Sequence, residues 1–204
     1  MAGLIAGSAV AALIYTMLMA VFLKADAENF KLNRVSAAVF MMMGMVVSAV
    51  LCFRHPGMVP AALFFGTLMF VAYSDYTQSE VYVLPCIGML VFGIVASVYV
   101  QAPVLVYIVS AVPILIGLTG IYGFGDGLVA SAVFLFSGYV AGTDDWAAAM
   151  LMFFIFNQVL WLIQLAVECI RKKRMDKSVL KTGMPAVPSM AVSAAAVLAF
   201  CSLY

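Results

Sequence analysis

The chain has 204 residues, of which 67% are hydrophobic and 9% charged, and its formal net charge is +1. A chain of this composition, with a mean hydropathy of +1.17, finds water a poor solvent and belongs in a lipid bilayer. The net charge of +1 implies no nucleic-acid partner. We therefore expect one all-α domain, residues 1–204, that crosses a membrane several times.

Charged and turn residues divide the apolar sequence at intervals close to the roughly 20 residues that a helix needs to cross a hydrocarbon core. We expect spans at residues 4–23, 35–53, 57–74, 83–100, 104–121, 127–142, 146–169 and 185–204. The first lacks the basic start of a signal peptide, so we interpret it as a span and not as a cleaved leader. Gln101 is the one strongly polar side chain in the break at 101–103, so the predicted number is about eight, with a range of six to eight.

Lysine and arginine remain on the cytoplasmic side of short membrane loops. Eight spans with the N-terminus outside place nine of the ten basic residues in cytoplasmic loops and leave only Arg54 outside. The same topology puts Asp75 and Asp126, each beside an end of a predicted span, at the cytoplasmic face of the cell membrane. Two acids 51 positions apart in the sequence are thus expected to meet.

The two acids are the candidate catalytic residues, because an ionisable group at hydrocarbon is costly enough to suggest a function. Two neighbouring carboxyls cannot both ionise cheaply, so one keeps a proton while the other carries the charge. Such a pair can activate water and protonate a leaving amine, as in aspartic proteases. Taken singly, each acid could also belong to an ordinary connection between helices without a catalytic role. Asp126 would then cap the start of a helix, and Asp75 would end one.

Asp126 lies in the sequence Gly123-Phe124-Gly125-Asp126-Gly127. Glycine permits positive φ and a close approach of the backbone. We therefore expect Gly123 and Gly125 to support the site by allowing a tight turn at the membrane face. They would also allow an extended peptide to lie against the chain.

Together these residues resemble the intramembrane aspartyl peptidases, which carry Gly-x-Gly-Asp at a membrane turn and another Asp at the end of an earlier span. The chain length indicates the branch of type IV prepilin and preflagellin peptidases. Tyr82 stands where that branch usually has proline, and Leu128 stands where it usually has lysine. Lys181, Pro185 and Pro188 are similar in spacing to a basic residue and prolines that precede the last helix of the branch.

The resemblance implies an endopeptidase that removes a short, positively charged leader from membrane-inserted pilin-like or archaellin-like precursors at the cytoplasmic face. Members that also methylate the new N-terminus carry a large loop with paired Cys-x-x-Cys motifs, which this chain lacks, so no methyltransferase activity is expected. No metal or other cofactor is expected, because the four cysteines are scattered among apolar residues. They are Cys52, Cys86, Cys169 and Cys201.

Two alternatives remain open. Signal peptide peptidase and presenilin share the Gly-x-Gly-Asp pattern and have Pro-Ala-Leu near the C-terminus, to which Pro185-Ala186-Val187 is similar. A non-enzymatic transporter could use Asp75 and Asp126 to carry protons or bind a cation. Replacing either acid with Asn while following leader cleavage and ion flux would separate these classes.

A set of polar residues follows one face of the predicted span 146–169. It comprises Asn157, Trp161, Gln164 and Glu168, at spacings of one helix face, and is expected to form a polar seam turned into the bundle. Three other acids, Glu80, Asp144 and Asp145, are expected to be dispensable for cleavage.

Overall fold

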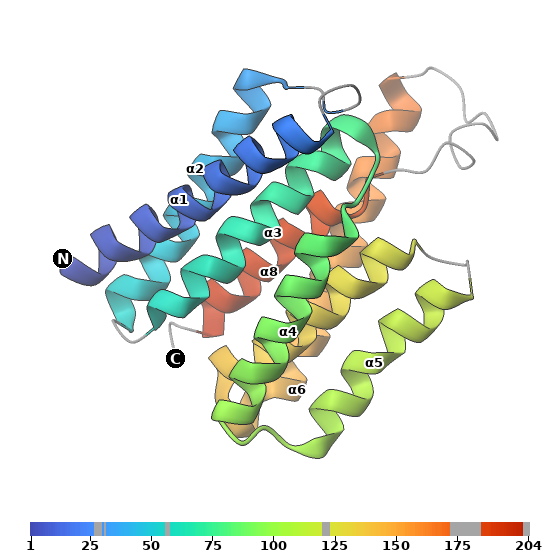
Figure 1. Ribbon diagram of the computed structural model, residues 1–204. Coiled ribbons are helices and arrows are strands. Elements are labelled where there is room, and N and C mark those ends of the chain that lie inside the picture. Colours follow the sequence, from blue (N-terminus) through green and yellow to red (C-terminus); the bar gives the residue numbers. More distant parts are fainter. Residues whose placement is uncertain (27–29, 31, 56–57, 120–122, 172–184, 202–204) are drawn as a thin grey trace.

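The computed structural model describes residues 1–26, 30, 32–55, 58–119, 123–171 and 185–201. Lys181 and most of the basic cluster that follows residue 171 lie outside these ranges, as do the side chains of Asp144 and Glu168. No strand occurs in the part of the chain described, so the expectation of an all-α fold is confirmed there. The helices are α1 (Ala2–Ala25), α2 (Arg34–Arg54), α3 (Val59–Gln78), α4 (Val83–Tyr99), α5 (Val104–Leu118), α6 (Phe124–Arg171) and α8 (Val187–Cys201) (Figure 1).

The helix ends lie within a few residues of the predicted boundaries, because local side chains and backbone conformations set them. Asn33 caps α2, since its side chain accepts hydrogen bonds from the amides of Val35 and Ser36. Ser79 ends α3 in the left-handed conformation, with φ of 56°. α3 therefore runs four residues beyond the predicted end at residue 74, which places Asp75 in its last turn.

α6 reverses its direction, as the two predicted spans 127–142 and 146–169 require. The rings of Phe134 and Phe153 lie 5.6 Å apart between centroids. In one straight helix, residues so far apart in sequence would be separated by roughly 28 Å along the axis. The chain therefore folds back between these two residues, and its second half returns toward the end of the bundle where α6 begins.

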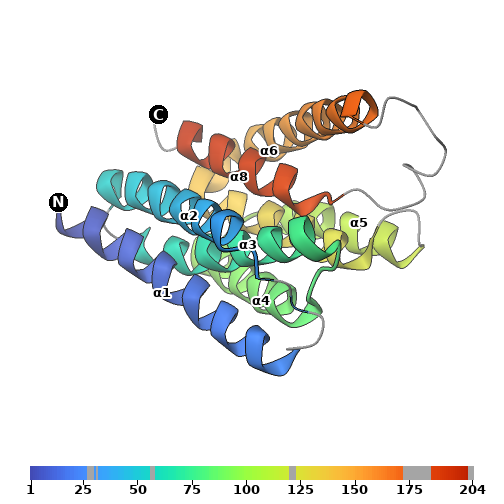
Figure 2. The ribbon, with the colours of Figure 1, turned by 90° about the horizontal axis from the view of Figure 1, so that it is seen from above.

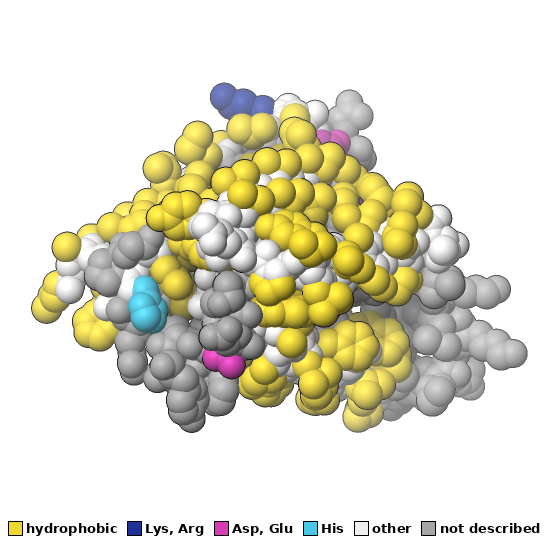
Figure 3. Space-filling view, turned by 90° about the horizontal axis from the view of Figure 1, so that it is seen from below, with side chains coloured by type: hydrophobic (Ala, Val, Ile, Leu, Met, Phe, Trp, Pro, Cys, Tyr) yellow, Lys and Arg dark blue, Asp and Glu magenta, His cyan; other side chains and the backbone are white. Residues whose placement is uncertain are grey.

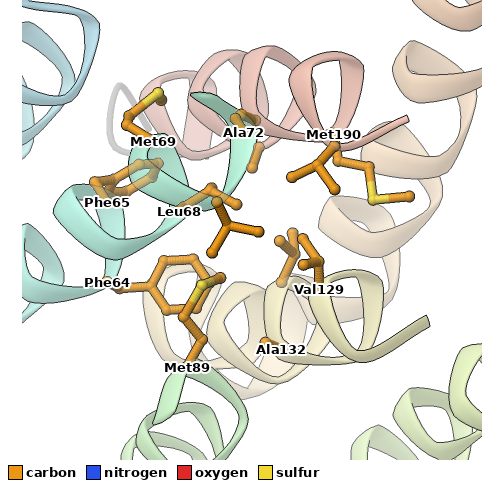
Figure 4. Packing of buried hydrophobic residues seen from close by; sticks show 14 of the residues in the cluster. Phe64, Phe65, Leu68, Met69, Ala72, Met89, Val129, Ala132 and Met190 are labelled. Atoms are coloured by element: carbon orange, nitrogen blue, oxygen red, sulfur yellow. The ribbon is translucent and has the colours of Figure 1, made fainter. Parts of the chain in front are cut away.

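α3 is the central helix. In its most apolar stretch 72% of the residues are buried, against 22% in α1. Figure 4 shows side chains of α3, among them Phe64 and Leu68, facing side chains from three other helices. These partners include Met89 of α4, Val129 and Ala132 of α6, and Met190 of α8.

The outer faces of the helices are apolar as well. Leu84 is 74% exposed and Val95 62% exposed, and Figure 3 shows hydrophobic side chains over most of one face. In the described residues, four helical segments are long and apolar enough to cross a membrane: Ala2–Ala25, Arg34–Phe53, Val59–Gln78 and Asp145–Val167. An apolar surface of this extent indicates a protein embedded in a membrane.

A groove of about 570 Å³ lies between α1, α3 and α4. Its lining is hydrophobic apart from Thr67, whose hydroxyl donates a hydrogen bond to the Leu63 carbonyl oxygen at 2.9 Å. The groove thus presents no group for acid–base chemistry. The two candidate acids, Asp75 and Asp126, lie at helix ends instead.

The contact between α1 and α3 predicts opposite effects of the same change at two helical glycines. A Cβ at Gly66 would lie 2.7 Å from the Ala11 carbonyl oxygen, whereas a Cβ at Gly88 of α4 would meet nothing within 4 Å. We expect Gly66→Ala to lower the free energy of unfolding by about 1–3 kcal/mol, because two backbones must separate. Gly88→Ala should leave it unchanged or raise it by up to about 1 kcal/mol. Thermal unfolding in detergent measures both, and equal behaviour of the two variants would contradict the close packing.

Candidate active site

Asp75 lies in the last turn of α3 and is 5% exposed. Its Oδ2 accepts a hydrogen bond from the amide of Val187 at 2.9 Å, and the amide of Ala186 also interacts with the carboxyl group. The first amides of a helix have no acceptor within that helix, and they favour negative charge. Asp75 thus supplies, from α3, the acceptor that the start of α8 lacks.

Asp126 lies in the first turn of α6 and is half-buried. Its Oδ1 is buried and has no hydrogen-bond partner among the residues described. Asp126 therefore differs from Asp75, whose carboxylate is held by the backbone of another helix. An acceptor left without a partner in the protein is able to bind a water molecule or a substrate group.

The two acids lie at the same end of the bundle, close enough for their charges to interact. Figures 1 and 2 both place the end of α3, the start of α6 and the start of α8 at that end. The buried thiol of Cys86 in α4 lies near both acids. The antiparallel course of successive helices thus brings together residues far apart in the sequence.

Of the two properties that glycine offers, positive φ and a close approach of the backbone, Gly123 and Gly125 use the close approach. Neither glycine has a φ in the left-handed region, and the non-glycine residues that do are Ser79 and Gln101. Both glycines instead allow close contacts. A Cβ at Gly123 would lie 2.6 Å from Asp126 Oδ2, so its absence leaves room for that carboxyl group.

Gly125 makes room for the connection between α3 and α4. A Cβ at Gly125 would lie 2.7 Å from Cβ of Val81. Since Val81 follows α3 within a few residues of Asp75, the contact fixes the start of α6 against the segment that carries the other acid. Gly125 thus supports the pair through packing.

Tyr82 and Leu128 occupy the positions where the prepilin peptidase branch usually has proline and lysine, and both have structural roles in this chain. The Tyr82 hydroxyl donates a hydrogen bond to Asp26 Oδ2 at 2.8 Å, and Gln78 Oε1 lies 3.0 Å away as a second acceptor. Burial, together with the carboxylate of Asp26, raises the pKa of Tyr82 well above its usual value. Tyr82 thereby links the end of α1 to the connection after Asp75, while Leu128 is buried in the core.

The predicted polar seam connects α6 to the start of α8. Gln164 Nε2 donates a hydrogen bond to the Pro185 carbonyl oxygen at 3.0 Å, and Asn157 Oδ1 accepts one from Ser189 Oγ at 2.9 Å. Trp161 is partly buried on the same helix. The contact of α8 with Asp75 was missed from the sequence, although the prolines at 185 and 188 mark where a helix begins.

The other acids are placed differently. Glu80 and Asp145 are exposed. No group of three or more His, Cys, Asp and Glu side chains in the described ranges could hold a metal ion.

Comparison of the chain with protein-family models, with curated proteins and with solved structures finds no match.

Proposed function

We propose that the protein is a membrane aspartyl endopeptidase that removes the short leader from pilin-like or archaellin-like precursors at the cytoplasmic face of the cell membrane. The observation that carries the proposal is the meeting of Asp75 and Asp126, from two different helices, at one end of a hydrophobic bundle. Two carboxyls whose charges interact do not both ionise easily, so one keeps its proton, and this is the requirement for acid–base hydrolysis by such a pair.

The environments of the two acids favour different roles. The amides at the start of α8 stabilise negative charge on Asp75, so Asp75 is the base that takes a proton from the attacking water. Asp126, whose charge interacts with that of Asp75 and whose Oδ1 has no donor among the residues described, is the acid that keeps its proton. Water adds to the peptide carbonyl, the C–N bond breaks, and the proton from Asp126 passes to the leaving amine.

The proposal includes eight spans and a cytoplasmic position of the acids. The alternating course of the helices and the reversal of α6 support this number. Lys24 in the last turn of α1 and Arg34 at the start of α2 lie at the acid-bearing end of the bundle, whereas α2 ends with Arg54 at the other. Basic residues collect on the cytoplasmic side, which supports this orientation.

The cut position tests the proposal. We expect purified protein in liposomes to cleave a precursor with a Lys-rich leader ending in Gly, at the boundary between the leader and the apolar helix. Acids at the end of a bundle reach only the juxtamembrane part of a substrate, and that part must be extended to expose its carbonyl group. Mass spectrometry of the products reports the position directly.

The same assay decides between the alternatives. The contact of Asp75 with Pro185-Ala186-Val187 favours a signal-peptide-peptidase-like protease as the second candidate, because a similar motif occurs in that group. A cut near the middle of the substrate's apolar helix would support it. An absence of any cleavage, together with ion flux that requires both acids, would overturn the peptidase proposal in favour of a transporter.

A further inference from the structure

In two consecutive peptide groups at the start of α8, the carbonyl oxygen accepts a hydrogen bond from a side chain and the N–H faces Asp75. The first joins Pro185 to Ala186: its carbonyl oxygen accepts a hydrogen bond from Gln164 Nε2, and its N–H belongs to Ala186. The second joins Ala186 to Val187: its carbonyl oxygen accepts a hydrogen bond from Ser189 Oγ at 2.7 Å, and its N–H donates to Asp75.

A peptide group is planar, and its C=O and N–H point in opposite directions. A side chain that holds the carbonyl oxygen therefore sets the direction of the N–H in the same plane. A hydrogen bond to the carbonyl also polarises the group and strengthens the N–H as a donor. Behind each N–H that faces Asp75, a side chain thus donates to the carbonyl oxygen at the opposite edge of the same peptide group, and the Met190 amide also donates to that of Ala186.

We propose that Gln164 and Ser189 are positioning residues that orient the Ala186 and Val187 amides toward the Asp75 carboxylate. Asn157 assists, because its Oδ1 shares the single hydrogen of the Ser189 hydroxyl with the Ala186 carbonyl oxygen. This assignment rests on the proposed peptidase function and extends it, since it explains how the base is held in place.

The surroundings of Gln164 support a specific role. Its neighbours Leu162 and Ile163 are 56% and 53% exposed, so this part of α6 presents a largely apolar surface. A polar amide in such a place is unfavourable unless it has a partner. The partner of Gln164 is the carbonyl of the peptide group that carries the first donor.

Each positioning residue has a matched control in the same helix. Gln158 of α6 is exposed, so Gln158→Met introduces the same side chain as Gln164→Met away from α8. Ser193 lies one turn after Ser189 in α8 and is also buried, but its hydroxyl has no hydrogen-bond partner among the residues described. Ser193→Ala therefore removes a buried hydroxyl without changing either peptide group.

The test measures single-turnover cleavage of the Lys-rich precursor by the full chain in liposomes. Gln164→Met and Ser189→Ala should each lower the rate constant by about 10- to 100-fold, because a misplaced base reacts slowly. The enzyme concentration that gives half the maximal single-turnover rate should change by less than about threefold, because the loss lies in the chemical step. Both controls should cleave at the wild-type rate. If the cleavage rate constants of all four variants fell in proportion to their loss of thermal stability, the assignment would be overturned.

Hydrogen exchange of the same proteins provides a readout that needs no activity. The amides of Ala186 and Val187 should exchange faster in Gln164→Met and Ser189→Ala, and at the wild-type rate in both controls. Unchanged exchange would overturn the positioning role. If the wild type cleaves no precursor, the peptidase proposal fails, and these exchange rates alone decide the positioning role.

Discussion

Asp75→Asn and Asp126→Asn should each reduce precursor cleavage by at least about 10³-fold, since each removes one member of an acid and base pair. Both variants should stay folded and inserted. In Asp75→Asn the side-chain amide oxygen is still able to accept the hydrogen bond from Val187, which holds the start of α8. Asp126→Asn keeps the shape of a side chain that the described protein does not hydrogen-bond at Oδ1. Gel analysis of cleavage, with thermal unfolding of the same samples, measures the two effects separately.

Exposed acids provide the matched controls for these substitutions. Glu80→Gln and Asp145→Asn remove a carboxylate of similar size at exposed positions, and both variants should retain most of the activity. Glu80 is the informative one, because it lies five residues after Asp75 in the chain. An essential Glu80 with a dispensable Asp75 would show that the first acid has been wrongly assigned.

Gly125→Val should reduce cleavage by about 100-fold, although no ionisable group is lost. The added side chain collides with Val81, whose Cβ would lie 2.7 Å from a Cβ at position 125. The start of α6, which carries Asp126, must then move away from the connection that follows Asp75. Cleavage assays compare this variant with Gly138→Val, where a Cβ lies at an ordinary 3.4 Å from Val106.

A second substitution shows whether packing is the cause. Gly125→Ala alone should impair cleavage, and Val81→Gly in the same chain should restore a large part of it, because the colliding side chain is gone. If glycine were needed only to let an extended substrate approach the backbone, Val81→Gly would restore nothing. This outcome would show that glycine is needed at position 125 for substrate access and not for packing against Val81.

The glycine-rich segment shows where sequence reasoning reached its limit. The sequence indicated that the backbone around Asp126 is special, and the structure agrees. Of the two expected reasons, positive φ and close approach, the structure shows the second, because Gly123 and Gly125 both accommodate neighbouring side chains. A missing Cβ serves either purpose, so the residue type alone does not distinguish them.

The sequence by itself determined the helices and the pairing of the acids. Helix length, apolar composition and turn residues are local properties, and a chain that crosses in alternating directions must bring Asp75 and Asp126 to one end of the bundle. It also indicated the reversal within 124–171, because Asp144 and Asp145 separate the predicted spans 127–142 and 146–169.

Only the tertiary structure decided how Asp75 is held. Its contact with Val187 joins residues 112 positions apart, and the contacts of Gln164 and Ser189 lie behind the same peptide groups. Such contacts depend on the angle and depth at which α8 packs between α3 and α6. These follow from the fit of many side chains at once, and no spacing within the sequence specifies them.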